Sequence, residues 1–191
     1  MMRLMERAAG RAGLPVKFSQ GFNPRPKMTL PLPHPVGVAG QGELLILELT
    51  EPLDGDALLQ RLGAQLPEGI VLTRCESVAS GMLHAASADF SLTVDAPRAQ
   101  ALARRLDELT HQEQWPWQRT KHDAPAQSKS LDLRVLVQNL SFDGHLLTFT
   151  LVPRQQAWAR VEEVLALLGL DEELDRARTV RTLSQWETTP R

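Results

Sequence analysis

The chain has 191 residues, of which 42% are hydrophobic, and a formal net charge of −2 at pH 7. A chain of this size can bury a substantial core, as one domain or as two small domains in contact, and its weak acidity argues against a surface built for nonspecific nucleic-acid binding. The single cysteine, Cys75, excludes an internal disulfide and the usual cysteine-ligated zinc and iron–sulfur sites, so we expect a core residue. Charges interrupt the longest apolar runs within a few residues, and we expect a cytoplasmic protein.

Positive charge is concentrated at one end of the chain. Residues 1–30 hold six basic residues against the single acid Glu6, so that the remaining 161 residues carry a net charge of −7. Apolar side chains at helical spacing predict a helix over residues 1–12, which Gly13 ends. The three arginines of this helix lie four residues apart and form a basic stripe along one side: Arg3, Arg7 and Arg11. A solvated face is the favoured interpretation of such a stripe.

The sequence of the rest of the first half predicts several short strands and one more helix. We expect a short strand over residues 16–19, an extended edge-like segment over residues 28–35, an inner strand over residues 43–50 and a strand over residues 70–76. Asp54 can cap a helix that runs to about residue 66. The order helix, strand, strand, helix, strand becomes the βαββαβ order of a ferredoxin-like unit if one strand is added in front. We therefore expect a ferredoxin-like half over residues 1–80 that starts inside its first helix and lacks its initial strand.

The second half of the chain repeats this pattern after a connection that is rich in small residues. We expect strands over residues 89–94, 115–117, 131–140, 146–152 and 178–186, and helices over residues 96–111 and 158–168. Asp95 is the expected cap of the first of these helices, and Asp143-Gly144 is a strong hairpin signal. Residues 121–129 are polar and predict a mobile segment. The fold class is therefore α+β, with two ferredoxin-like halves, the second over residues 86–191.

The main functional clue is the backbone of residues 19–27, which read Ser-Gln-Gly-Phe-Asn-Pro-Arg-Pro-Lys. Gly21 allows a sharp turn, and Asn23 before a proline favours turn initiation. Pro24 and Pro26 fix two φ angles and remove two amide donors, so the segment can neither coil into a helix nor join a central strand. The sequence predicts a stiff turn.

The side chains of this stiff turn suit an anionic ligand. Arg25 and Lys27 place two cations on it, and they would bind phosphate or carboxylate. Asn23 would form hydrogen bonds, and Phe22 could cover a base or an apolar partner surface. The alternative interpretation is a rigid corner with solvated cations.

Several stretches of the chain share one family pattern. They are Arg11-Ala12-Gly13-Leu14-Pro15, Gly21-Phe22-Asn23-Pro24-Arg25-Pro26-Lys27, Pro31-Leu32-Pro33, Val36-Gly37-Val38, Gly42-Glu43, Lys129-Ser130-Leu131-Asp132-Leu133-Arg134 and Val161-Glu162-Glu163-Val164-Leu165. They closely resemble the bacterial radical-SAM-linked protein family, a domain of unknown function, and the similarity covers nearly the whole chain. Members of that family occur alone or attached to a radical SAM protein with a cobalamin-binding-type domain, and some are joined to a ribonuclease of the E/G type. The resemblance implies a radical SAM protein as partner.

The chain departs from the family pattern in two places. Members usually begin with a strand and a Ser-His-Leu-Asp-like segment, whereas this chain opens inside the first helix at Met1. We therefore expect that piece to be missing, either because the start site is placed too late or because this variant has lost it. The position after Pro24 is often histidine in the family and is Arg25 here. Arginine keeps a donor but does not titrate near neutral pH, which argues against a catalytic role.

Three charged residues form a possible second face: Lys129, Asp132 and Arg134. Asp132 and Arg134 share one side of an expected strand. An exposed ion pair between them is the simpler interpretation. The family resemblance favours the alternative, in which this face adjoins the anion-binding segment. Trp115 and Trp117 are better interpreted as core or interface residues than as base-stacking platforms. The histidines lack ligand spacing, and no phosphate loop, serine elbow or paired catalytic carboxylates can be found. We expect no metal, no cofactor and no catalytic residue.

These observations predict a non-catalytic binding or accessory module that works beside a radical SAM protein. The module would contact RNA or a ribonucleoprotein through the basic segment, and no membrane. The RNA part rests on the basic N-terminal region and on the family's ribonuclease fusions. Two alternatives stay open: an enzyme of unknown reaction that needs the missing N-terminal segment, and a purely structural protein–protein adaptor with the two tryptophans at its interface.

Overall fold

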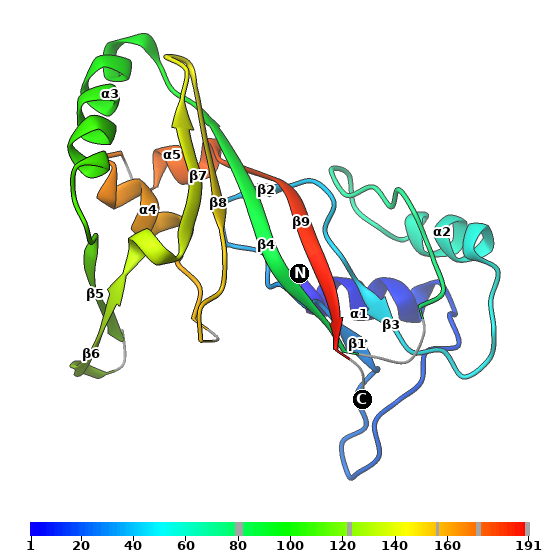
Figure 1. Ribbon diagram of the computed structural model, residues 1–191. Helices are drawn as coiled ribbons and strands as arrows, with labels where there is room; N and C mark the ends of the chain where they lie inside the picture. The colour runs from blue at the N-terminus through cyan, green and yellow to red at the C-terminus, as the bar shows by residue number, and fades with distance from the viewer. Residues whose placement is uncertain (79–81, 122–123, 156, 171–172, 190–191) are drawn as a thin grey trace. The chain divides into compact units, whose positions relative to one another are not determined.

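The computed structural model describes residues 1–78, 82–121, 124–155, 157–170 and 173–189 (Figure 1). The chain divides into two compact units. Unit 1 comprises Met1–Pro33, Leu44–His84 and Thr188–Arg191, and unit 2 comprises His34–Glu43 and Ala85–Glu187. The helices and strands of the two units give the α+β class that the sequence predicts. Among the helices of the described residues, none combines the length and the apolar character needed to cross a bilayer.

Two helices form the frame of unit 1, and local sequence signals set their ends. Helix α1 (Met2–Arg11) ends before Gly13, whose φ of +60° is a left-handed conformation that glycine adopts without steric cost. Helix α2 (Gly55–Gly63) begins after Asp54, whose Oδ2 accepts a hydrogen bond of 3.1 Å from the Ala57 amide. Both helices form where the sequence predicts them.

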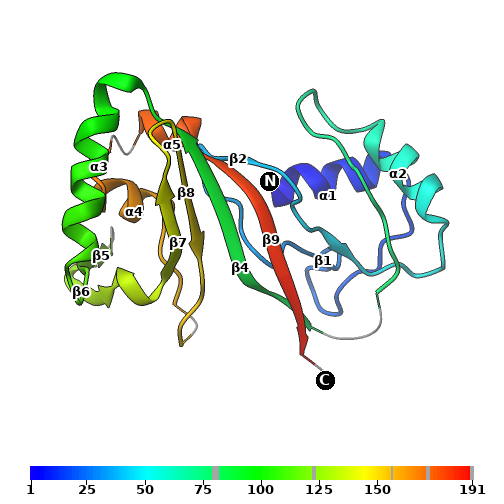
Figure 2. The same cartoon turned by 45° about the horizontal axis from the view of Figure 1, so that its top comes forward.

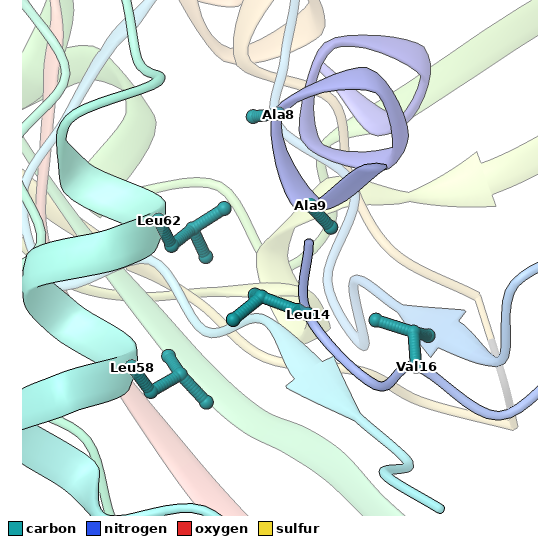
Figure 3. Packing of buried hydrophobic residues seen from close by; sticks show 6 residues of the cluster. All are labelled: Ala8, Ala9, Leu14, Val16, Leu58 and Leu62. Atoms are coloured by element: carbon teal, nitrogen blue, oxygen red, sulfur yellow. The ribbon is translucent and has the colours of Figure 1, made fainter. Parts of the chain in front are cut away.

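An aliphatic core joins α1 to α2 (Figure 3). Its buried members are Ala8, Ala9, Leu14, Val16, Leu58 and Leu62. Arg61 of α2 also donates hydrogen bonds to the carbonyl oxygens of Ala12 and Gly13, at 3.0 and 2.5 Å. These bonds satisfy carbonyl groups at the end of α1 that the helix itself leaves without partners. Cys75 is half-buried and packs against this cluster, as expected of a small core residue.

The strands of unit 1 are shorter than the sequence predicts. Strand β1 (Met28–Thr29) pairs antiparallel with β3 (Ile46–Leu47), and this is the only sheet within the described part of unit 1. Residues 70–76, expected as a strand, have no regular secondary structure. The expected inner strand over residues 43–50 is reduced to β3, whose two residues are only half-buried. The ferredoxin-like half without its initial strand, expected over residues 1–80, is therefore not formed by these residues.

Prolines explain part of this difference. Pro31, Pro33 and Pro35 follow β1 directly and have no amide to donate to a neighbouring strand, so the ladder ends at Thr29. The same stretch leads into residues 34–43, which the sequence places in the first half but which belong to unit 2.

The main sheet has five strands in the order β2-β9-β4-β8-β7. They are β2 (Ala39–Gly40), β4 (Met82–Thr93), β7 (Val137–Phe142), β8 (Leu146–Leu151) and β9 (Val180–Thr189). Strand β8 pairs antiparallel with both β4 and β7, and β2 pairs parallel with β9. Without β2, the order β9-β4-β8-β7 is that of a ferredoxin-like βαββαβ unit. These four strands thus have the strand order of the fold expected for the second half, and β2 is an added edge strand.

Three helices belong to this unit: α3 (Ala96–Thr110), α4 (Val161–Leu167) and α5 (Leu174–Arg178). Figures 1 and 2 show α3 and α4 on the same side of the sheet. Alternate side chains of β4 and β8 are buried and apolar, and the rings of Phe90 and Phe149 stack with their centroids 5.2 Å apart. Because successive strand residues point to opposite faces, the side chains between them belong to the other face of the sheet, and these are polar.

The connection between α3 and β7 differs from the prediction. The described members of residues 121–129, expected to be mobile, belong to the hairpin of β5 (Pro116–Lys121) and β6 (Ala124–Asp132). The strand expected over residues 131–140 is interrupted by a short 3-10 helix, η1 (Leu133–Val135). Trp115 has the expected core role, since it is buried and its indole Nε1 donates to the Leu109 carbonyl at 3.0 Å.

Candidate functional site

The predicted anion-binding segment folds as a short hairpin, here called the basic hairpin and defined as residues 16–28. Phe18 and Pro26 face each other across it in an antiparallel bridge. The Ser19 amide donates a hydrogen bond of 2.8 Å to the Arg25 carbonyl, which closes the hairpin below its tip. In Figure 1 the tip, drawn in blue, extends away from α1 and α2 of the same unit.

The tip of the basic hairpin is fixed by backbone conformation and by one side chain. Gly21 has a φ of +126°, so the turn depends on a conformation that other residues rarely adopt. The Ser19 hydroxyl accepts a hydrogen bond of 3.0 Å from the Arg25 amide, so Ser19 holds Arg25 through both its backbone and its side chain. The stiff turn that the sequence predicts is therefore present.

The base of the basic hairpin is tied to Glu48. The Lys17 amide donates to the Glu48 carbonyl at 2.7 Å, and the Glu48 amide donates to the Lys27 carbonyl at 3.0 Å. The Glu48 carboxylate also lies 3.1 Å from Lys27 Nζ and 3.8 Å from Lys17 Nζ. Pairs as exposed as these stabilise a fold little. Lys27 therefore shares its charge with an acid that an incoming anion would have to replace.

The other side chains of the tip point into solvent. Phe22 is 106% exposed and Phe18 is 50% exposed. Asn23 and Arg25 are exposed as well, and within the described residues Arg25 forms no ion pair. Single exposed apolar residues are normal on a protein surface, but two rings and a guanidinium on one fixed turn form a concentrated contact surface.

The basic stripe of α1 is only partly available to a ligand. Arg3 and Arg7 are exposed. Arg11, in contrast, donates from Nη2 to the Gln65 carbonyl at 2.8 Å and from Nε to the side-chain oxygen of Gln65 at 3.4 Å. Arg11 thus connects α1 to the segment that follows α2, a structural role that the stripe pattern alone did not indicate.

The possible second face belongs to unit 2, and its residues have separate roles. Asp132 Oδ1 accepts hydrogen bonds from the amides of Trp115, at 2.8 Å, and Arg134, at 3.0 Å. Asp132 therefore caps η1, and the structure contains no ion pair between Asp132 and Arg134, both of which it describes. Lys129 lies on β6 directly opposite Arg119 of β5. The prediction that Asp132 and Arg134 share one face of a strand was wrong, because η1 begins between them.

The sequence analysis missed a charge cluster around a buried arginine in unit 2. Arg181 of β9 is 1% exposed, and its guanidinium binds both carboxylate oxygens of Glu43, with an Nε to Oε1 distance of 2.7 Å. Nδ1 of His34 lies 3.3 Å from Glu43 Oε1, and its Nε2 lies 2.5 Å from the Val38 carbonyl oxygen. Both ring nitrogens of His34 are thus engaged in holding residues 34–43 in place. An arginine inside an expected strand was the signal available in the sequence.

Comparison with known proteins places the chain in a family. Residues 1–163 match the model of the DUF2344 family, described as an uncharacterized protein conserved in bacteria. The chain belongs to the DUF2344 family. No curated protein and no solved structure matches it. The DUF2344 match includes the whole basic hairpin and the strands β4, β7 and β8, whereas Arg181 lies beyond it.

Proposed function

We propose that this DUF2344 protein is a binding module that contacts RNA, free or within a ribonucleoprotein, through the basic hairpin, and that it works beside a radical SAM protein. The observation that carries the proposal is the full exposure of Phe22 next to the exposed Arg25, on a turn fixed by Gly21 and Ser19. A base of any identity can stack on an aromatic ring, and a guanidinium binds phosphate through paired hydrogen bonds.

Charge in the same unit supports an anionic ligand. Lys17 is 51% exposed at the base of the basic hairpin, and Arg3 and Arg7 are exposed on α1. Because the whole chain has a net charge of −2, attraction to RNA must come from this local concentration of cations and not from the overall field. Phosphate contacts of this kind give an affinity that falls steeply as salt is added.

The radical SAM partner rests on the family resemblance of the chain's motifs, among them the basic hairpin itself. On this account the radical chemistry belongs to the partner, and the DUF2344 protein supplies a contact with the substrate or with its carrier. The RNA part and the partner part can therefore be tested separately.

Fluorescence anisotropy with a short labelled oligouridylate tests the RNA part. We expect the double variant Phe22→Ala/Arg25→Ala to weaken binding by more than about tenfold, since stacking and phosphate contact are both lost. Wild-type affinity should fall steeply between about 50 and 200 mM KCl. Arg104→Ala, which removes an exposed arginine of α3, and Val71→Ala, which trims an exposed apolar side chain, are matched controls that should bind as the wild type does.

A protein–protein adaptor is the second candidate, and the exposure of Phe18 together with Phe22 favours it. An adaptor that relies on these rings would bind its radical SAM partner with little dependence on salt and would lose that partner in Phe22→Ala. Unchanged oligouridylate binding by the double variant Phe22→Ala/Arg25→Ala would show that the basic hairpin does not bind RNA.

A further inference from the structure

The sheet of unit 2 carries a polar hollow on the face opposite to the buried apolar side chains. The hollow has a volume of about 500 Å³ and is lined by residues of β4, β7, β8 and β9. Its polar lining includes Ser87, Asp89, Asn139, Thr150, Thr182 and Gln185. The volume is within the range that small-molecule sites occupy. The sequence analysis named none of these residues, because they are spread over four strands that lie far apart in the sequence.

A chain of hydrogen bonds within the hollow positions one carboxylate. Asn139 Nδ2 donates to Thr150 Oγ1 at 3.2 Å, and Thr150 Oγ1 donates to Asp89 Oδ1 at 2.7 Å. Thr150 is 8% exposed, so its hydroxyl is held inside the protein between its two partners. The three side chains come from β7, β8 and β4. Asp89 is therefore held by Thr150 of the neighbouring strand β8, and Thr150 in turn by Asn139 of β7.

Asn139 reaches Thr150 through an irregularity of β7. The register of β7 against β8 shifts between Gln138 and Ser141, and Asn139 has a φ of +50°. A positive φ is uncommon outside glycine, although asparagine tolerates it better than most residues. Bulges of this kind re-aim a side chain and are frequent next to binding sites. The bulge thus re-aims one side chain of the lining toward Thr150.

The charge of the hollow selects the class of ligand. Asp89 and Glu187 are acids, and none of the described residues that line the hollow is basic. A carboxylate has about four positions that can accept a hydrogen bond, so Asp89 can accept further donors beside the Thr150 hydroxyl. Hydroxyl and amide oxygens of the lining add more acceptors. The lining suits a positively charged ligand rich in N–H groups and repels an anion.

We propose that this hollow binds a small organic cation with several N–H donors, of the polyamine class, with Asp89 as its counter-ion. A primary ammonium group carries its charge and three donors on one atom, which matches a carboxylate surrounded by neutral oxygen acceptors. The proposal does not depend on the basic hairpin, which lies in unit 1 and takes a ligand of opposite charge.

Isothermal titration calorimetry of the full chain with spermidine tests the proposal. We expect saturable binding that Asp89→Asn weakens by at least about tenfold. Tetramethylammonium has the charge but no N–H donors, and it should bind far more weakly than spermidine. Asp107→Asn makes the same charge change at an 80% exposed residue of α3 and should leave the affinity unchanged.

A second variant keeps the test decisive if Asp89→Asn does not fold. Asn139→Gly removes the amide but keeps a residue that accepts the positive φ. Spermidine should shift the backbone amide resonances of Asp89 and Thr150 in the wild type, and it should do so with lower affinity in Asn139→Gly. The proposal is overturned by absence of saturable binding to the wild type, by equal affinity of Asp89→Asn, or by equal affinity of tetramethylammonium.

Discussion

Unit 1 and unit 2 hold their strands in different ways. In unit 2, β4 and β8 pair continuously from Ala88 and Leu151 to Thr93 and Leu146. In the described part of unit 1, the only sheet joins two strands of two residues each. The ferredoxin-like sheet is thus supported by its own hydrogen-bond ladder and by stacked rings, whereas the basic hairpin depends on a few individual contacts. A single substitution can therefore alter the hairpin without altering a sheet.

The candidate surfaces of the two units also differ, and the difference is one of charge. The basic hairpin of unit 1 presents Arg25, Lys27 and an exposed ring. The hollow of unit 2 presents carboxylate, hydroxyl and amide oxygens. We therefore expect each surface to prefer ligands of the charge that the other repels.

Loss of the buried arginine should be the most damaging of these changes. Arg181→Met keeps an apolar side chain of similar length but leaves the Glu43 carboxylate without its guanidinium partner. Removal of one member of a fully buried ion pair costs about 3 kcal/mol, and the loss here should be smaller, because the Glu43 side chain is 29% exposed and water can reach its carboxylate. We expect the urea midpoint of unfolding to fall accordingly, with RNA binding by the remaining folded protein unchanged.

Arg178→Met is the matched control for this prediction. Arg178 is 44% exposed and pairs with the exposed Asp95 at 2.7 Å. Its replacement should leave the unfolding midpoint nearly unchanged, because exposed pairs stabilise little. Equal midpoints for the two variants would show that the Arg181 cluster does not hold residues 34–43.

Two glycines of unit 1 should respond to alanine with opposite signs. Nothing lies within 4 Å of a Cβ added at Gly21, so Gly21→Ala is unfavourable only because φ is +126°, and it should destabilise the protein by about 1 kcal/mol. Gly10 lies in α1 with equally open surroundings, and Gly10→Ala should stabilise the protein by about 0.5 kcal/mol. Thermal unfolding measures both, and a stabilising Gly21→Ala would contradict the account of the turn.

The smallest effect concerns Asp95 in acid. The hydrogen bond from Arg178 holds the pKa of Asp95 below its ordinary value of 3.8. Because this pKa is lower in the folded state than in the unfolded state, Asp95 contributes stability above pH 3.8 and loses that contribution as the pH falls further. The difference in melting temperature between wild type and Asp95→Asn should therefore be present at about pH 7 and shrink by about pH 3. A difference that grows in acid would contradict this assignment.

Features that depend on neighbouring residues could be predicted from the sequence. Asp54 at the start of α2, Gly13 after α1 and the Asp143-Gly144 turn between β7 and β8 are all local signals, and the structure contains each. The stiff turn at Gly21 has the same local origin. Asp95 precedes α3 as expected, but its side chain does not cap the helix and instead accepts hydrogen bonds from Arg98, a near neighbour, and from Arg178, 83 positions away.

Features that depend on distant partners could not be predicted. Arg181 binds a carboxylate 138 positions away, and Lys27 meets Glu48 only because β3 passes the base of the basic hairpin. The hydrogen-bond chain of the hollow joins three strands through a bulge that no local motif announces. Nothing in the structure explains why residues 70–76 form no strand despite their apolar pattern.

The most direct test of the central proposal is a nuclear magnetic resonance titration of the full chain with oligouridylate. The account predicts that backbone amide shifts concentrate in the basic hairpin, with the largest changes around Phe22 and Arg25, and that β4, β7 and β8 stay unchanged. Shifts confined to the sheet of unit 2, or no shifts at all, would contradict the proposal that the basic hairpin binds RNA.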